Sequence, residues 1–495
     1  MRVLLPLPVV LPLLGAGLSI AFGRWRWVQR AIGVIVLTAT SIISLVMLVK
    51  VDQDGAAAAQ VGGWEAPIGI TLVADRLSAI MLSIASIMLL AVLVYAMGQG
   101  GTERHRVAFH PVYLVLSAGV AASFLTGDLF NLFVAFEMML TASYVLITLG
   151  GRREQVRAGM TYVVISLIAS ALFLTALALI YAATGTVNMA DLAVKMGELP
   201  EAVRLAFSLL LFMVFGIKAA VFPLFFWLPD SYPTAPSPVT AVFAGLLTKV
   251  GVYAIIRTQL LFIPPSDRPS GLILTVAGLT MVVGVLGAIA QADMKRILSF
   301  HIISQIGYMI MGLGLFTVAG IAAAIFYVAN QIVLKATLLL VSGLVEEAAG
   351  SSGLGRIGGI ARRFPLLGWL FLLPALSLAG VPPFSGFVAK LALVEAGVSQ
   401  GAWVVVAVSL FVSVLTLFSM TKIWGGAFWG KPEVVVEPSG VVARWGGTAP
   451  MLGSTIALVV LSLAIAVWAG PLYALCERAA VDLLDPSTYV SVVLP

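Results

Sequence analysis

Apolar residues fill most of the chain in long runs that short polar segments separate. Fourteen runs approach or exceed the roughly 20 residues that a helix needs to cross about 30 Å of hydrocarbon. Each run is therefore predicted to be a transmembrane helix. The first follows Arg2 as a signal peptide would, but it lacks a small-residue cleavage site before Arg24 and is interpreted as a span. The predicted spans are 3–22, 31–49, 76–97, 110–126, 128–149, 158–183, 204–228, 237–262, 271–291, 297–316, 319–345, 365–398, 402–428 and 451–470.

Prolines interrupt two of these spans near mid-depth, Pro223 in span 7 and Pro382 with Pro383 in span 12. Proline removes a backbone donor, and the freed carbonyls are tolerated at membrane depth only inside protein or beside a water-filled cavity. Because five spans separate the breaks, the two halves run in opposite senses, a pattern typical of transporters. The sequence thus predicts an all-α polytopic membrane protein with inverted five-helix repeats, spans 4–8 and 9–13, and broken helices 7 and 12. The expected units are 1–109 (spans 1–3), 110–262 (first repeat), 271–428 (second repeat) and 429–495 (a loop and span 14).

Composition and charge agree with a membrane protein. The chain of 495 residues is 61% hydrophobic and only 10% charged, whereas soluble domains have about 25% charged residues. This excludes an ordinary soluble enzyme, and the net charge of +6 is scattered too widely to bind nucleic acid. With the N-terminus outside, fifteen Lys and Arg fall in inner loops and eight in outer loops. The positive-inside rule then predicts that both termini lie outside.

No cofactor is expected. One cysteine, Cys476, excludes a disulfide framework, a Cys-ligated iron–sulfur cluster and a structural zinc site. Three histidines, at positions 105, 110 and 301, are too few to form a His-rich metal or haem centre alone, and no phosphate-binding glycine loop is present. The sequence does not identify a sodium site.

Ionisable residues inside the predicted spans are the strongest functional signal, because each costs several kcal/mol in hydrocarbon. Four mid-span lysines face a single mid-span glutamate, so ion pairing does not neutralise them all. Burial disfavours the charged amine, and a lysine that exchanges its proton near neutral pH can serve a proton relay. We therefore favour proton transfer over the alternative, a purely structural set of ion pairs. The residues are Glu137, Lys218, Lys249, Lys335 and Lys390.

Neutral polar residues near these lysines are candidate accessory sites. Each either holds a water molecule or bonds a neighbouring carbonyl. They are Thr248, His301, Ser304, Gln305, Asn330 and Gln331. Lys422 and Glu395 lie nearer their span ends, where a long side chain reaches the interface, and are interpreted as structural.

Five stretches of this sequence resemble a known family over residues 65–425. The family comprises the antiporter-like subunits of Mrp-type Na+/H+ antiporters, respiratory complex I and related hydrogenases. Within it, the chain is most similar to the D subunits of Mrp complexes, partly because Lys390 stands where the fourth complex I subunit type usually has Glu. The stretches are GDLFNLFVAFEMML (127–140), KAAVFPLFFWLP (218–229), APSPVTAVFAGLLTKVGVYAIIR (235–257), DMKRILSFHIISQIGY (293–308) and KATL (335–338).

The resemblance implies roles for individual residues. Glu137 and Lys218 would form an ion pair that gates proton entry, and Lys249 would be the next station. Lys335 would continue the central polar axis and Lys390 would lead to the far exit. Gln305 stands where some relatives have histidine, which removes one station of the family pattern.

The resulting hypothesis is a proton-translocating subunit of a multisubunit Na+/H+ antiporter in a prokaryotic plasma membrane. Its expected partners are a larger A subunit, a C subunit and small membrane subunits, with Na+ handled by the complex. The alternatives are a proton-pumping subunit of complex I or of a membrane-bound hydrogenase and, in another class, a non-conducting scaffold subunit.

Overall fold

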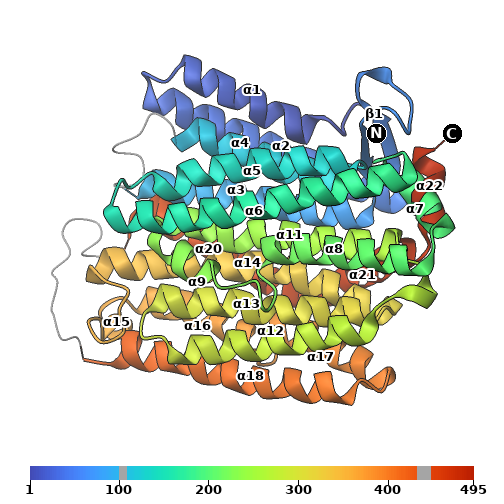
Figure 1. Ribbon diagram of the computed structural model, residues 1–495. Helices are drawn as coiled ribbons and strands as arrows, with labels where there is room; N and C mark the ends of the chain where they lie inside the picture. Colours follow the sequence, from blue (N-terminus) through green and yellow to red (C-terminus); the bar gives the residue numbers. More distant parts are fainter. Residues whose placement is uncertain (100–108, 432–446, 495) are drawn as a thin grey trace.

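The computed structural model describes residues 1–99, 109–431 and 447–494, which form a bundle of nearly parallel helices (Figure 1). His105, Arg104, Arg106 and Arg444 lie outside these residues. The long apolar runs become helices because a helix satisfies its own backbone hydrogen bonds without water. The helices in the first half are α1 (Leu7–Ala21), α2 (Arg26–Asp54), α3 (Arg76–Gly98), α4 (Phe109–Leu125), α5 (Leu129–Thr148), α6 (Arg153–Thr184), α7 (Met189–Glu198), α8 (Glu201–Ala219), α9 (Leu228–Ser231), α10 (Ser237–Val242) and α11 (Thr248–Leu261). Those in the second half are α12 (Ser270–Ala290), α13 (Met294–Gly314), α14 (Val318–Ala349), α15 (Ile360–Arg363), α16 (Pro365–Ala379), α17 (Ser385–Ser399), α18 (Trp403–Ile423), α20 (Ala449–Val467), α21 (Ala469–Leu484) and α22 (Pro486–Val493).

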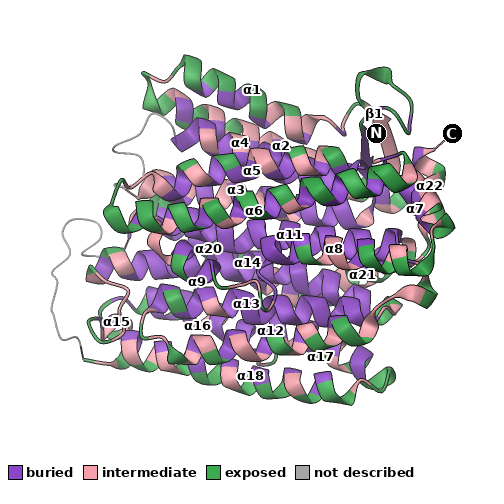
Figure 2. Cartoon of the chain, in the orientation of Figure 1, coloured by how far each residue is buried: buried purple, intermediate pink, exposed green. Residues whose placement is uncertain are grey.

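The predicted spans are confirmed. Among the described residues, 11 helices are long and apolar enough to cross a membrane, and three shorter apolar helices, α1, α4 and α16, supply the rest. The spans differ in burial: the windows of α14 and of Ser237–Leu261 are 100% buried, whereas that of α2 is 33% buried. Figure 2 shows the buried residues gathered in the middle of the bundle. The polar side chains of α11, α13 and α14 therefore lie inside protein, away from lipid.

The two ends of the bundle differ. A short antiparallel hairpin of β1 (Ala57–Gln60) and β2 (Thr71–Ala74) lies with α7, α22 and both chain termini at one end, here called the strand end (Figure 1). The other end carries α15 and is called the α15 end. Sequence reasoning did not predict the hairpin, α7, α21 or α22, because these elements are short and lack the length signal of a span.

Helices 7 and 12 are broken as predicted, and both breaks have the same geometry. The first half-helix of each ends in a left-handed residue, Ala220 (φ 60°) after α8 and Gly380 (φ 87°) after α16. One residue later, the backbone N–H reaches back five residues: Val221 donates to Gly216 O at 2.9 Å and Val381 to Leu376 O at 3.1 Å. Pro223, Pro382 and Pro383 lie just beyond, where helix 7 turns irregular and helix 12 restarts as α17.

The first two helices of each repeat are joined in the same way, 165 residues apart. Residues 127–129 pair with 187–189 through two backbone hydrogen bonds of 2.8 and 2.9 Å. Residues 292–294 pair with 352–354 through two of 2.9 Å. The first pairing lies beside β2 at the strand end, and the second lies near α15. The two segments therefore repeat one construction in opposite orientations.

Two glycines show the same correspondence. A Cβ on Gly119 would lie 2.9 Å from the α5 backbone, and one on Gly284 would lie 2.4 Å from the α13 backbone. Each glycine thus lets the first helix of its repeat approach the second closely. The limits 110–262 and 271–428 for the repeats, and 1–109 and 429–495 for the flanking units, stay predictions.

Candidate functional site

The four mid-span lysines are all buried. Lys249 and Lys335 are fully covered, Lys218 and Lys390 are 7% exposed, and Glu137 is half-buried. No salt bridge involves any of these five residues within the described parts of the chain. Their partners are hydroxyls, backbone carbonyls and one aromatic ring.

Ser170 stands between Glu137 and Lys218. Its hydroxyl donates a short hydrogen bond to Glu137 Oε1 and accepts one from Lys218 Nζ at 3.1 Å. The direct ion pair that the family resemblance implied is replaced in this structure by a three-residue link from α5 through α6 to α8. Ser170 was missed because a serine in a membrane helix normally bonds its own backbone and carries no distinct sequence signal.

Lys218 lies in the last turn of α8, two residues before the break. Its Nζ also donates to Ser166 O at 3.2 Å. Unpaired carbonyls at a helix C-terminus carry partial negative charge, so the break supplies a favourable environment for a cation at mid-depth. A cavity with about 10 Å³ for a water centre, enough for one water molecule, adjoins Lys218, Ser166 and the Tyr232 ring.

Lys249 owes its main contact to a local widening of the helix. Residues 243–247 form a π-helical turn between α10 and α11, and Lys249 Nζ donates to Ala244 O within it at 2.5 Å. The same amine is 3.4 Å from Thr248 Oγ1. Such turns free backbone carbonyls and occur frequently at functional sites. The turn packs on α14, because a Cβ on Gly245 would lie 3.7 Å from Ala336 Cβ.

Lys335 lies near the middle of α14, and its Nζ has no hydrogen-bond partner among the described residues. One turn earlier, neither the nitrogen nor the oxygen of the Gln331 side chain has a partner, and the Ser304 hydroxyl on α13 also lacks one. Buried polar atoms are normally satisfied by protein or ordered water. The segment around Lys335 is therefore the most polar and least satisfied part of the core.

Lys390 reaches from α17 back to the other half of its broken helix. Its Nζ donates to Ala379 O, the last residue of α16, at 3.1 Å and lies 5.0 Å from the centre of the Tyr308 ring. Gly380 is needed here, since a Cβ at this position would lie 2.8 Å from Lys390 Cδ. Tyr308 was not predicted; its hydroxyl donates to Ser409 O at 2.6 Å on α18.

The remaining predicted residues take up two kinds of environment. Gln305 accepts a short hydrogen bond from Tyr327, and Asn330 accepts one from Ser385 at 2.8 Å beside the helix 12 break. His301 bonds Ser419 at 2.5 Å through Nε2 and is fully buried. Its expected proximity to Lys295 and Arg296 does not produce a contact, because those side chains pair with Glu346 and Asp230.

Comparison with known proteins agrees with this geometry. The family model described as NADH:quinone oxidoreductase/Mrp antiporter, TM, matches residues 126–416. The chain belongs to this family. It is 44% identical to the D subunit of the Na(+)/H(+) antiporter of Alkalihalophilus pseudofirmus, covering 100% of both chains. It is 36% identical to the protein of the same name from Bacillus subtilis, covering 99% of this chain and 98% of that one.

Solved structures of the NADH:quinone oxidoreductase/Mrp antiporter family share the fold. A chain of the Mrp complex from Dietzia sp. DQ12-45-1b matches with a TM-score of 0.93 and 34% identity, covering 100% of both chains. A chain of the membrane-bound sulfane sulfur reductase, an archaeal respiratory membrane complex, matches with a TM-score of 0.89 and 28% identity, again over 100% of both chains. The chain is thus a multi-pass membrane protein of a transporter family.

Proposed function

We propose that this chain is the proton-translocating subunit of a multisubunit Na+/H+ antiporter in the plasma membrane of a prokaryote. The observation that carries the proposal is the set of four buried lysines whose partners, within the described residues, are neutral groups. A lysine held by a carboxylate would be fixed as part of an ion pair. Lysines held by hydroxyls and carbonyls retain the freedom to release and accept a proton.

The proposed path runs from Glu137 through Ser170 to Lys218, then to Lys249, Lys335 and Lys390. Helix α14 connects the later stations, since it packs against the π-helical turn before Lys249 and against α17, which carries Lys390. The unpartnered polar atoms around Lys335 are suited to internal water molecules that extend the path. Entry of protons down their gradient drives Na+ outward through the complex.

We assign the strand end to the outside and the α15 end to the cytoplasm. The excess of Lys and Arg in the loops of the α15 end supports this orientation, which places both termini outside. The partners are the other subunits of an Mrp-type complex: a larger A subunit, a C subunit and small membrane subunits. The full-length match to the D subunits of two bacterial antiporters supports this assignment over a complex I or hydrogenase subunit.

The test is Na+-dependent dissipation of a pH gradient in everted vesicles that contain the whole complex. Lys218→Ala and Lys335→Ala are each expected to abolish exchange while the complex still assembles. Lys195→Ala, on the surface of α7 and paired only with Asp191, is the matched control that retains exchange. Full exchange in both core variants would refute the relay and leave a scaffold role. Dependence of proton movement on electron transfer, without Na+, would identify a redox-driven pump instead.

A further inference from the structure

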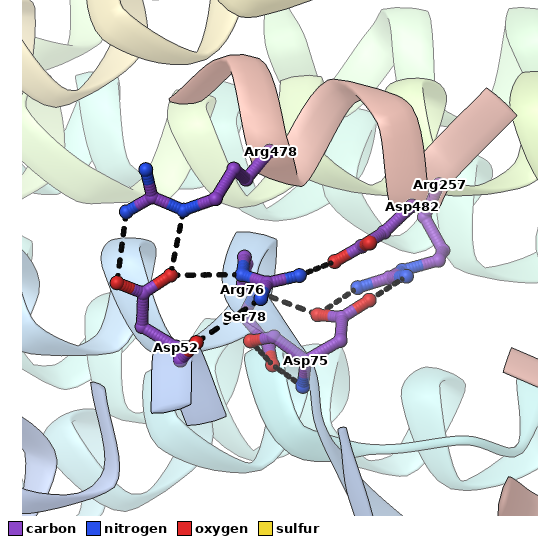
Figure 3. Close-up of polar contacts among 7 residues, drawn as sticks. All are labelled: Asp52, Asp75, Arg76, Ser78, Arg257, Arg478 and Asp482. Carbon is purple, nitrogen blue, oxygen red and sulfur yellow. Dashed lines mark hydrogen bonds and ion pairs between the residues drawn. The ribbon is translucent and has the colours of Figure 1, made fainter. Parts of the chain in front are cut away.

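A buried ion pair closes the strand end of the first repeat. Arg257 of α11, 3% exposed, binds Asp75 with both of its terminal nitrogens, one of them at 2.8 Å (Figure 3). The guanidinium lies between two tyrosine rings, 5.4 Å from the centre of Tyr253 and 5.3 Å from that of Tyr489. Asp75 also caps α3 through Ser78. The cation is therefore fixed in place on every side.

Arg257 stands between the relay and the strand end. Lys249, Tyr253 and Arg257 are spaced four residues apart, so their side chains follow one face of α11. Arg257 donates to Tyr253 Oη at 3.2 Å, and that hydroxyl donates to Phe124 O at the end of α4 at 2.8 Å. A small cavity with about 20 Å³ for water centres adjoins the pair, lined also by residues of α21 and α22.

A second layer of charges holds this arrangement from above. Arg76 binds Asp52 at 2.9 Å and Asp482 at 2.6 Å, and Arg478 binds Asp52 at 2.8 Å (Figure 3). These contacts join α2, α3 and α21 beside the Asp75–Arg257 pair. The C-terminal helix α21, which is too short and too charged to be a span, thus covers the closed end of the first repeat.

The second repeat places a cation at the corresponding position. Lys422 lies 165 residues after Arg257, the same interval that relates the paired loops of the two repeats. Its Nζ donates to Ile289 O at 2.8 Å and to Gln291 O at 2.7 Å, at the end of α12 near the α15 end. Ile289 in turn lies 165 residues after Phe124, whose carbonyl the Tyr253 hydroxyl binds. One position, at opposite ends of the bundle, therefore carries a basic residue tied to the first helix of its own repeat.

We propose that Arg257 and Lys422 are fixed positive barriers that close the strand end of the first repeat and the α15 end of the second. A proton or Na+ is repelled by a fixed cation in a low-dielectric passage, as in other channels that exclude cations. Each half then opens at one end only, and protons cross the membrane only by passing sideways from Lys249 to Lys335. The inference rests on the proposed relay and adds to it the reason why the relay does not leak.

The test measures proton leak through the complete complex in proteoliposomes without Na+. A pH gradient is imposed, the membrane potential is clamped with K+ and valinomycin, and internal pH is followed with a dye. The double variant Asp75→Asn with Arg257→Gln removes both charges while keeping polar side chains, so that no buried charge is left unpaired. Lys422→Gln tests the other end, because its amide still donates to the α12 carbonyls. Arg257→Lys, which keeps the charge, is the matched control.

The double variant and Lys422→Gln are each expected to raise the leak about tenfold, which corresponds to ~1.4 kcal/mol of lost barrier. Arg257→Lys should leak no faster than the parent, and adding Lys249→Ala to the double variant should suppress its leak. An assembled complex with an unchanged leak, or a leak that persists without Lys249, would overturn the proposal. If the double variant does not assemble, Lys422→Gln with and without Lys335→Ala decides the question. Failure of the relay itself would appear separately, as full antiport in Lys218→Ala.

Discussion

The hydroxyl of Ser170 offers the sharpest test of the path between Glu137 and Lys218. Ser170→Ala removes one hydrogen bond to the carboxylate and one from the amine while leaving the backbone of α6 intact. A hydrogen bond to a charged group contributes about 1.5–3 kcal/mol. If proton transfer requires one such link, its loss slows that step roughly 10- to 150-fold. Ser170→Thr, which restores a hydroxyl, should recover most of the rate.

The assay is the initial rate of Na+-dependent proton movement in vesicles with equal amounts of assembled complex. Thr175→Ala on the same helix is the matched control, because its hydroxyl bonds only the backbone of Ala171, at 2.9 Å, and faces outward. Antiport in Ser170→Ala within twofold of Thr175→Ala would refute the bridging role. Equal loss in the Ala and Thr variants would show that packing at this position, and not the hydroxyl, matters.

Three further outcomes are expected. Tyr308→Phe keeps the ring beneath Lys390 and loses only the bond to Ser409 O, so antiport should fall less than in Tyr308→Leu, which also loses a cation–π contact of about 1–2 kcal/mol; initial rates distinguish the two. Gly284→Ala, whose Cβ would lie 2.4 Å from Ser304 N, should destabilise the subunit by about 1–3 kcal/mol, seen as a lower Tm in detergent, whereas Gly271→Ala, with nothing within 4 Å, should not lower the Tm. Burial alone raises the pKa of the Asp75 carboxyl, but Arg257 and Ser78 outweigh it and hold this pKa below its usual range. The pair is then complete above about pH 4 and is lost only as pH falls through the lowered pKa, so proton leak should stay flat from about pH 5 to 9; a leak that rises within this range would contradict the assignment.

The fold could be predicted to within a few residues because length and hydropathy determine a transmembrane helix. Pro223, Pro382 and Pro383 marked the two breaks for an equally direct reason, since proline cannot continue the hydrogen-bond ladder. The strand hairpin and α21 could not be predicted. Their position depends on ion pairs such as Arg76–Asp482, which join residues hundreds of positions apart.

The candidate site was predicted in its charges but not in its connections. A buried lysine is conspicuous in an apolar sequence, whereas Ser170 and Tyr308 are ordinary residues whose roles arise from the neighbours that folding gives them. Arg257 was assigned to an outer loop because it lies near a span end. The structure instead buries it, because Asp75 supplies a matching carboxylate and two tyrosines cover the remaining surface.

The repeat also explains why the two halves differ chemically. Tyr162 and Tyr327 lie 165 residues apart on α6 and α14, and at the same interval Ser170 corresponds to Lys335. Glu137 corresponds to Ile302, so the second half has no carboxylate at this position. In the first half, therefore, an acid and an amine share a proton across a hydroxyl. In the second, the amine occupies the place of the hydroxyl and has no acid beside it. A common scaffold thus holds a regulated pair on one side and an unpaired station on the other, and this asymmetry makes the order of proton transfer between them meaningful.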